Sequence, residues 1–354
     1  MVLSTAGASR TASAGPTPAG GETLAEPQPV CTVDDPRLAE LSGLVTEGPP
    51  GASPTRYHAI DDGGGDTARA FALDPATCAV TGERSAPVDV VDVEDLGMSP
   101  DGALWLADVG DNTARRDAVR LVVLPPDGPA RVHDLTYPDG PRDAEALLVA
   151  DDGTPLLVDK TAGAAGVYRP ARPLEADGPV PLERVAEVVL PYSATRGGPL
   201  GPAGARTITG GAVAPPGATA RAAALRTYTD AWLFPLPADR PLTGDVLVEA
   251  LRGAPMPVPL PDEPQGEAVA LDGAGTLHSG TEARGMSPAG VRAVPGAVTA
   301  ATAPAAPVVA QPAEVPDVPR AYPSWLPAVA GAGVLGVALL AGIGAMIVHG
   351  RRRS

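Results

Sequence analysis

The sequence is poor in basic residues. It has 26 Lys and Arg residues against 42 Asp and Glu residues, a formal net charge of −16. A protein that binds nucleic acid needs a basic face for the phosphates, so this balance argues against such a partner. An acidic body instead fits a soluble surface domain or one that attracts cations. Lys160 is the only lysine and all other strong bases are arginine, which singles Lys160 out as a candidate site residue.

Cysteine and the familiar hydrolase motifs are also scarce. The chain has two cysteines, Cys31 and Cys78, and neither lies in a CxxC pair or beside other metal ligands. The signatures GxSxG, HExxH and SxxK are absent, so the sequence does not point to those hydrolase classes. In an exported domain an even cysteine count predicts a disulfide between Cys31 and Cys78. Two unrelated free thiols are the alternative.

What the sequence does contain is a repeated phrase of a glutamate, an apolar run, a turn with glycine and a second apolar run. It occurs as EDLGMSPDGALWLAD from Glu94, EALLVADDGTPLLVD from Glu145 and EAVALDGAGTLHSGT from Glu267. A short strand, a tight turn and a second strand that recur at roughly fifty residues are typical of a β-propeller blade. The sequence therefore predicts an all-β fold of the propeller class.

The repeat also predicts how many blades the propeller has and how it closes. Equivalent openings at Ser42 and Gly211, which lack the glutamate, give five blades in all. A sixth would require a degenerate blade in the insert RGGPLGPAGAR. The last blade runs out of strands near residue 295, so we expect residues 31–34 to complete it. The Cys31–Cys78 bridge would then tie the closing strand to the first blade.

Propeller geometry places the three glutamates, Glu94, Glu145 and Glu267, at one mouth of the central channel. The loops after each second strand should add further polar side chains there, namely Asp108, Asp111, Asn112, Lys160, Arg226 and Asp230. Converging carboxylates repel one another unless something compensates. A hard cation such as Ca²⁺, ion pairs with Lys160 or Arg226, or a raised carboxyl pKa suited to acid–base catalysis would each do so. Alternatively, each glutamate is a structural residue that hydrogen-bonds the backbone of the neighbouring blade.

Near the C-terminus lies an uncharged segment, from Trp325 to Val348. It is long enough to cross about 30 Å of hydrocarbon as a helix. Arg351, Arg352 and Arg353 follow it, and by the positive-inside rule they stay cytoplasmic. We therefore expect a single-pass protein of the cell membrane whose acidic body is extracytoplasmic. A tail-anchored protein with a cytosolic body is the alternative, which the arginines disfavour.

These features divide the chain into five parts. Residues 1–30 are expected to be disordered or the remnant of a signal segment, whose true start would lie upstream. The other four parts are a propeller at 31–295, a Pro/Ala-rich stalk at 296–323, a transmembrane helix at 324–349 and a basic tail at 350–354.

Several phrases are specific enough to indicate a family. DVEDLGMSPDGALWLADVGDN, YPDGPRDAEALL, LRTYTDAW and PDEPQGEAVAL resemble a family of exported actinobacterial β-propeller proteins that is generally uncharacterised. The resemblance covers roughly residues 31–294 and implies the fold and a surface location, but no reaction. More distantly, the architecture is similar to phytase-like esterases and calcium-dependent lactonase propellers. Those bind a divalent metal at the channel mouth, and only that location carries over to this chain.

The sequence thus predicts a membrane-anchored surface module for binding or scaffolding. Its ligand would be a small molecule or a protein, and Ca²⁺ is the candidate cofactor. The alternative is a metal-dependent hydrolase of phosphoester or lactone type, with Glu94, Glu145, Glu267 and Lys160 as the candidate catalytic residues and the three glutamates as metal ligands.

Overall fold

The computed structural model describes residues 24–174, 178–285 and 287–303. The predicted basic tail and membrane segment lie outside these ranges, as do most of the stalk and of the N-terminal segment. Within the described ranges, no helix combines the length and the apolar character needed to span a membrane.

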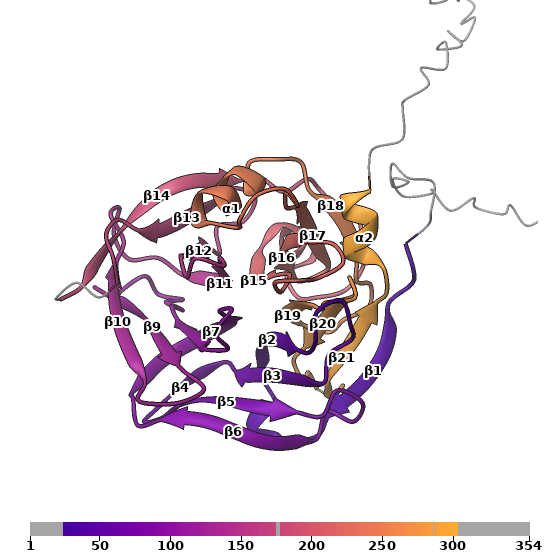
Figure 1. The fold of residues 1–354 in the computed structure, drawn as a ribbon, viewed down its shortest axis with the longest axis horizontal. Helices are drawn as coiled ribbons and strands as arrows, with labels where there is room; N and C mark the ends of the chain where they lie inside the picture. The colour runs from indigo at the N-terminus through magenta and orange to yellow at the C-terminus, as the bar shows by residue number, and fades with distance from the viewer. Residues whose placement is uncertain (1–23, 175–177, 286, 304–354) are drawn as a thin grey trace, which may run out of the picture. The chain divides into compact units, whose positions relative to one another are not determined.

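Almost all regular structure in these ranges is β-strand, arranged in four sheets (Figure 1). One sheet is ordered β2 (Leu41–Glu47), β3 (Arg56–Asp61), β5 (Ala68–Leu73) and β6 (Val80–Ala86). Another is ordered β15 (Ile208–Val213), β16 (Ala222–Thr227), β17 (Asp230–Pro235) and β18 (Met256–Pro259). A third is ordered β19 (Gly266–Leu271), β20 (Leu277–Thr281), β21 (Ala289–Val294) and β1 (Gln28–Val33).

The fourth sheet has nine strands and contains two antiparallel runs of the same kind. The first run is β7 (Val90–Met98), β8 (Leu104–Asp108), β9 (Val119–Leu124) and β10 (Arg131–Thr136). The second is β11 (Ala144–Val149), β12 (Pro155–Asp159), β13 (Ala165–Pro170) and β14 (Val180–Val188). A short parallel pairing of β10 with β14 joins the runs, and β4 (Gly63–Gly65) adds to the edge of β7.

This arrangement is a β-propeller, as the repeat predicts. The runs stand around a central axis (Figure 1), and β2, β7, β11, β15 and β19, each the first strand of its run, contact one another in a circle. Glu145 and Glu267 are each the second residue of their innermost strand, and Glu94 lies in the middle of β7. The insert at 196–206 forms the short 3-10 helix η2 (Gly201–Arg206) and no strand.

The ring is closed by the N-terminal strand, as predicted. Strand β1 pairs antiparallel with β21, and its Cys31 forms a disulfide with Cys78. The closing strand begins at Gln28, before the predicted domain boundary at residue 31. Helix α2 (Ala297–Thr302) lies beyond the predicted boundary at 295, in what was expected to be stalk, and buries Ala297 and Val298 in the core.

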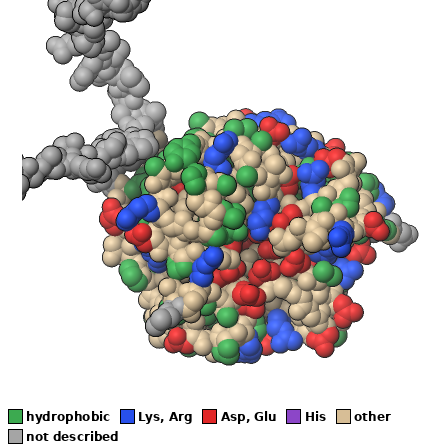
Figure 2. All heavy atoms as spheres, turned by 180° about the vertical axis from the view of Figure 1, so that it is seen from behind, with side chains coloured by type: hydrophobic (Ala, Val, Ile, Leu, Met, Phe, Trp, Pro, Cys, Tyr) green, Lys and Arg blue, Asp and Glu red, His purple; other side chains and the backbone are tan. Residues whose placement is uncertain are grey.

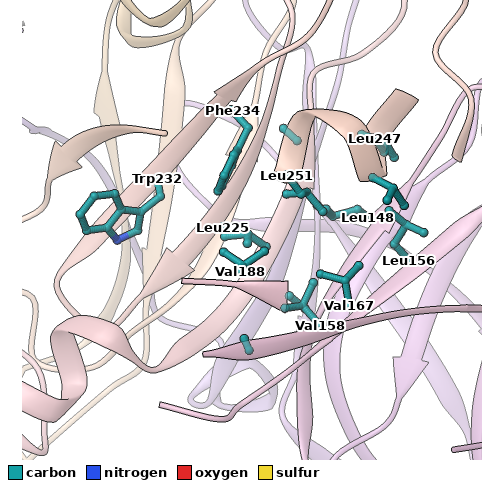
Figure 3. Packing of buried hydrophobic residues seen from close by; sticks show 14 of the residues in the cluster. Leu148, Leu156, Val158, Val167, Val188, Leu225, Trp232, Phe234, Leu247 and Leu251 are labelled. Atoms are coloured by element: carbon teal, nitrogen blue, oxygen red, sulfur yellow. The ribbon is translucent and has the colours of Figure 1, made fainter. Parts of the chain in front are cut away.

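The cores lie between neighbouring sheets, and the largest cluster also includes helix α1 (Gly244–Leu251) (Figure 3). Leu148 and Val158 come from one sheet, Leu225 and Phe234 from the next, and Leu251 from the helix. Burying each such side chain contributes about 1.5–3 kcal/mol. These contacts, which include Leu148 of the innermost strand β11, hold the innermost strands in place, so other residues of those strands can be chosen for chemistry.

Candidate functional site

A β-bulge places the repeated glutamates. In β7 the pairing shifts between Val93 and Asp95, so that Glu94 is the extra residue. The same shift occurs in β11 between Ala144 and Ala146, where Glu145 is the extra residue. A bulge leaves its extra residue out of the ladder and re-aims the side chain.

All five innermost strands carry this bulge at the same place. In β19 the shift encloses Glu267 and Ala268, and in β2 it encloses Ser42 and Gly43. In β15 the extra residue is Thr209. The sequence-based alignment, which put Gly211 in this position, was therefore wrong by two residues, because the bulge is invisible in the apolar pattern. The five equivalent positions carry three glutamates, a serine and a threonine.

The three glutamates converge and are buried. Glu94 is only 3% exposed, and Glu145 and Glu267 are buried to a similar extent. Each lies close enough to another of the three for their charges to interact. On the face of the ring opposite to that in Figure 1, acidic side chains gather around the centre (Figure 2).

Three aspartates that were not singled out individually complete two clusters with metal-ligand geometry. In one, an oxygen from each of Asp62, Asp92 and Glu94 lies within 4.8 Å of the others. In the other the same holds for Glu94, Asp143 and Glu145, so Glu94 belongs to both clusters.

The strands explain how these aspartates reach the mouth. Asp92 and Asp143 each stand two residues before a bulge glutamate, in DVE and DAE. Asp62 directly follows β3, in the loop that was predicted to lie at this face. The Asp-x-Glu pattern was the available signal for two of them; Asp62 had only the loop DDGGGD.

Lys160 is the cation of this mouth. It directly follows β12 and forms an ion pair with Glu145, while its side chain stays 24% exposed. Burial alone would lower the pKa of its ammonium, but Glu145 and then Glu94 raise that pKa above its ordinary value. The ammonium therefore keeps its charge at neutral pH and offsets one of the surrounding carboxylates.

One lysine does not compensate the remaining acidic groups. Burial, reinforced by Glu145, raises the pKa of Glu94 to about 11. Burial also raises the pKa of Glu267 well above its ordinary value, and Oε2 of Glu267 has no hydrogen-bond partner among the described residues. Burial raises the pKa values of Asp62 and Glu282 to about 7 each. Without a further cation, the folded mouth therefore holds protons near neutral pH.

The structural role considered for the glutamates belongs to Asp95. Its Oδ2 accepts the backbone N–H groups of Leu147 on β11, at 2.7 Å, and of Gly211 on β15, at 2.9 Å. Its Oδ1 accepts the N–H of Leu96 at 2.8 Å. Asp95 is the residue after Glu94 in β7, and it is fully buried. Its carboxylate accepts hydrogen bonds from the backbones of β7, β11 and β15, and so links three innermost strands. Asp95 is not among the predicted site residues.

Two of the predicted ligand-binding aspartates, Asp108 and Asp111, have structural partners. Asp108 is buried, forms an ion pair with Arg116 at 2.9 Å and accepts the backbone N–H of Asp92, also at 2.9 Å. Asp111 accepts the backbone N–H of Arg116 at 2.8 Å and so holds its own turn. The third residue of this loop, Asn112, is exposed. Through its hydrogen bond with the backbone N–H of Asp92, Asp108 holds one of the clustered aspartates in position.

Arg226 and Asp230 are also committed to local structure. Arg226 is fully buried in an ion pair with Glu263 rather than with a mouth glutamate. Asp230 accepts the hydroxyls of Thr195, at 2.7 Å, and Thr229, at 2.6 Å. Of the predicted site residues, Glu94, Glu145, Glu267 and Lys160 are therefore the ones brought together at the mouth. Glu94 and Glu145 belong to the clusters with the aspartates, whereas Glu267, also predicted as a metal ligand, belongs to neither.

Comparison with known proteins adds distant structural likeness. No protein-family model matches the chain, and no curated protein does. A PQQ-bound aldose sugar dehydrogenase from Streptomyces coelicolor is 11% identical, over 79% of this chain and 99% of that one, with a TM-score of 0.40. A putative gluconolactonase is 12% identical, over 75% and 97% of the two chains, with a TM-score of 0.36. The β-propeller domain of Cps50 (Swd1) from Myceliophteria thermophila is 10% identical, over 76% and 99%, with a TM-score of 0.33. Likeness at this level does not extend to a ligand or a reaction.

Proposed function

We propose that this chain is a membrane-anchored, extracytoplasmic β-propeller of five blades that binds a divalent cation at the acidic mouth of its channel. The blade count is supported by the five innermost strands, each of which begins an antiparallel run of four. Anchoring is supported by the uncharged segment from Trp325 to Val348 and the arginines that follow it. The cation would prepare the mouth to bind a small molecule or a partner protein.

One observation carries the cation site. The side chain of Glu94 is 3% exposed, and among the described residues no hydrogen bond or ion pair is formed by its carboxyl group. It nevertheless faces Asp62 and Asp92, whose oxygens lie within 4.8 Å of its own. In the same cluster, Oδ1 of Asp62 is buried without a hydrogen-bond partner among the described residues. Buried charges are normally paired or bound to metal. A cation among these three residues would satisfy Glu94 and remove their mutual repulsion.

Ligand chemistry favours Ca²⁺ among the common cations. All three ligands are carboxylates, and neither sulfur nor imidazole belongs to either cluster. Hard cations prefer such oxygen ligands, and Ca²⁺ accepts irregular sets of six to eight that include water. The partial exposure of Asp62 and Asp92 leaves room for the water or ligand oxygens that complete the shell.

Calcium titration of metal-free protein tests this proposal. We expect isothermal titration calorimetry to show binding, and unfolding free energy to rise by about 2.7 kcal/mol when Ca²⁺ is at 100 times its dissociation constant. Glu94→Gln should weaken binding at least roughly tenfold. Asp127→Asn is the matched control, because it removes one acidic charge from an exposed loop. No binding at millimolar Ca²⁺, or equal effects of the two substitutions, would contradict the proposal.

A hydrolase is the second candidate, and the position of Glu282 favours it. Glu282 directly follows β20, is buried, and interacts electrostatically with Asp62. A bound cation would supply Lewis acidity, and a carboxyl that exchanges a proton near neutral pH can act as a general acid or base. Phosphoester and lactone substrates should be assayed with Ca²⁺ present. Glu282→Gln should then lower turnover while calcium binding persists; an inactive wild-type protein would leave only the binding role.

The membrane anchor needs a separate test. In cells that express the full chain, we expect the protein in the membrane fraction after alkaline carbonate washing. The outer layers of the cells are made permeable while the cell membrane stays intact, and protease is then added. The protease should digest the propeller. Removal of residues 324–354 should release it. A protein that stays soluble with this segment in place would refute the anchor without bearing on the cation.

A further inference from the structure

We infer that the acidic mouth contains a second divalent-cation site, formed by Glu94, Asp143 and Glu145, which the ammonium of Lys160 fills in the native protein. This inference rests on the proposed function, because the first cation site shares Glu94 with the second. Lys160 would then set how many divalent cations the mouth holds.

The geometry of the second cluster matches that of the first. One oxygen from each of Glu94, Asp143 and Glu145 lies within 4.8 Å of the other two. Glu94 and Glu145 are buried, and Asp143 is partly exposed, as the cation ligand nearest to solvent needs to be. A carboxylate has two oxygens, so Glu94 can serve both clusters as a bridging ligand.

A cation already sits at this cluster, namely the protein's own. The Nζ atom of Lys160 forms an ion pair with Glu145, one of the three ligands. Lys160 also interacts electrostatically with Glu94, Glu267 and Glu282. The ion pair shows that Glu145, one ligand of this cluster, already has a positively charged partner.

The choice of lysine at position 160 also supports an ammonium in the place of a metal ion. Lys160 is the only lysine in a chain whose other strong bases are all arginine. An ammonium is a compact point charge on a flexible stem, whereas a guanidinium is a planar fork. Only the ammonium resembles a metal ion in size and in the way it is surrounded by oxygens. Its 24% exposure leaves it a path to withdraw into solvent.

The first cluster differs from the second because, among the described residues, no basic side chain forms an ion pair with its carboxylates. Within the described chain, no lysine or arginine forms an ion pair with Asp62, Asp92 or Glu94. An added divalent cation therefore enters the first cluster without displacing a protein group, but must displace Lys160 from the second. We expect the wild-type protein to bind one divalent cation and a variant without the ammonium to bind two.

Cation stoichiometry tests the inference, measured by equilibrium dialysis against ⁴⁵Ca²⁺ and by calorimetry. Lys160→Met should raise the number of bound Ca²⁺ ions from one to two, whereas Lys160→Arg, which keeps a charge, should bind one. Lys160→Gln provides a second neutral variant should the Met variant fold poorly. Adding Asp143→Asn to Lys160→Met should return the number to one, while adding Asp127→Asn should leave it at two.

The outcomes separate this inference from the proposed function. One bound ion in the wild type and still one in both neutral variants would overturn the second site and leave the first intact. Two ions in the wild type would overturn the blocking role of Lys160. No bound ion in either form would overturn the cation-binding function itself.

Discussion

Glu94 and Asp95 are neighbours in one strand, yet their carboxylates have opposite environments. Asp95 lies in a closed layer of the channel, where backbone N–H groups of Leu96, Leu147 and Gly211 satisfy it. Glu94 lies in the mouth just outside that layer, equally buried, with other carboxylates around it. The bulge between Val93 and Asp95 creates the difference, because it turns the two successive side chains to different surroundings.

The carboxylate of Asp95 thus stabilises the fold, whereas that of Glu94 is available to a ligand. Burial raises the pKa of Asp95 well above its ordinary value, and the three backbone N–H bonds offset part of that desolvation. Loss of the carboxylate would leave those donors without an acceptor. A buried acid among like charges gains nothing from the folded state without a cation. The channel thus has a structural layer and an adjoining layer that is under electrostatic strain.

The largest expected effect is the loss of Asp95. Asp95→Ala leaves three buried N–H groups without an acceptor, at about 1–3 kcal/mol each. We expect urea unfolding to show a loss of at least about 3 kcal/mol. Asp95→Asn keeps one acceptor oxygen and should fall between this variant and the wild type. A loss below about 1 kcal/mol for Asp95→Ala would mean that Asp95 does not hold the innermost strands together.

The pH dependence of stability should reveal the strained layer. The folded pKa values of Asp62 and Glu282, about 7, lie above those of the unfolded chain. The folded state therefore binds more protons between about pH 4.5 and 7, and stability falls as pH rises through that window. Without Ca²⁺ we expect unfolding free energy to drop by roughly 2 kcal/mol from pH 5 to pH 8, after allowance for solvent screening.

Calcium is the control for this pH effect. Saturating Ca²⁺ should remove or reverse the drop, since the cation stabilises the ionised carboxylates and competes with protons. The double variant Asp62→Asn, Glu282→Gln should make the metal-free profile less steep, while Glu94, whose pKa burial raises to about 11, keeps its own contribution. If the metal-free protein is more stable at pH 8 than at pH 5, repulsion among the carboxylates of the mouth does not destabilise the folded state.

The smallest expected effect concerns Thr209, which occupies the same bulge position as Glu94. Its hydroxyl donates to the carbonyl of Gly266 at 3.0 Å. Thr209→Val keeps the shape and removes this bond, so we expect a loss of about 1 kcal/mol in urea unfolding. Calcium affinity should stay unchanged, because Thr209 belongs to neither cation cluster. A weaker affinity in this variant would extend the site to the β15 side of the mouth.

Much of the fold follows from local features of the sequence. The phrases that begin at Glu94, Glu145 and Glu267 mark innermost strands, and the Cys31–Cys78 disulfide and the closing N-terminal strand are confirmed. The position of Gly211 was wrong because a bulge shifts register without changing the apolar alternation. Asp95 was overlooked because its partners lie 52 and 116 residues away in the chain.

The residue types that recur, the positions of the turns and the single lysine among many acids can all be read along the chain. Those are properties of composition and short-range spacing. Three contacts depend instead on the folded arrangement: Asp95 joins three strands, Asp62 comes close to Glu94, and Arg226 pairs with Glu263 and not with a mouth glutamate. The reason is physical: the partners of a buried charge are set by the packing of distant strands around the axis.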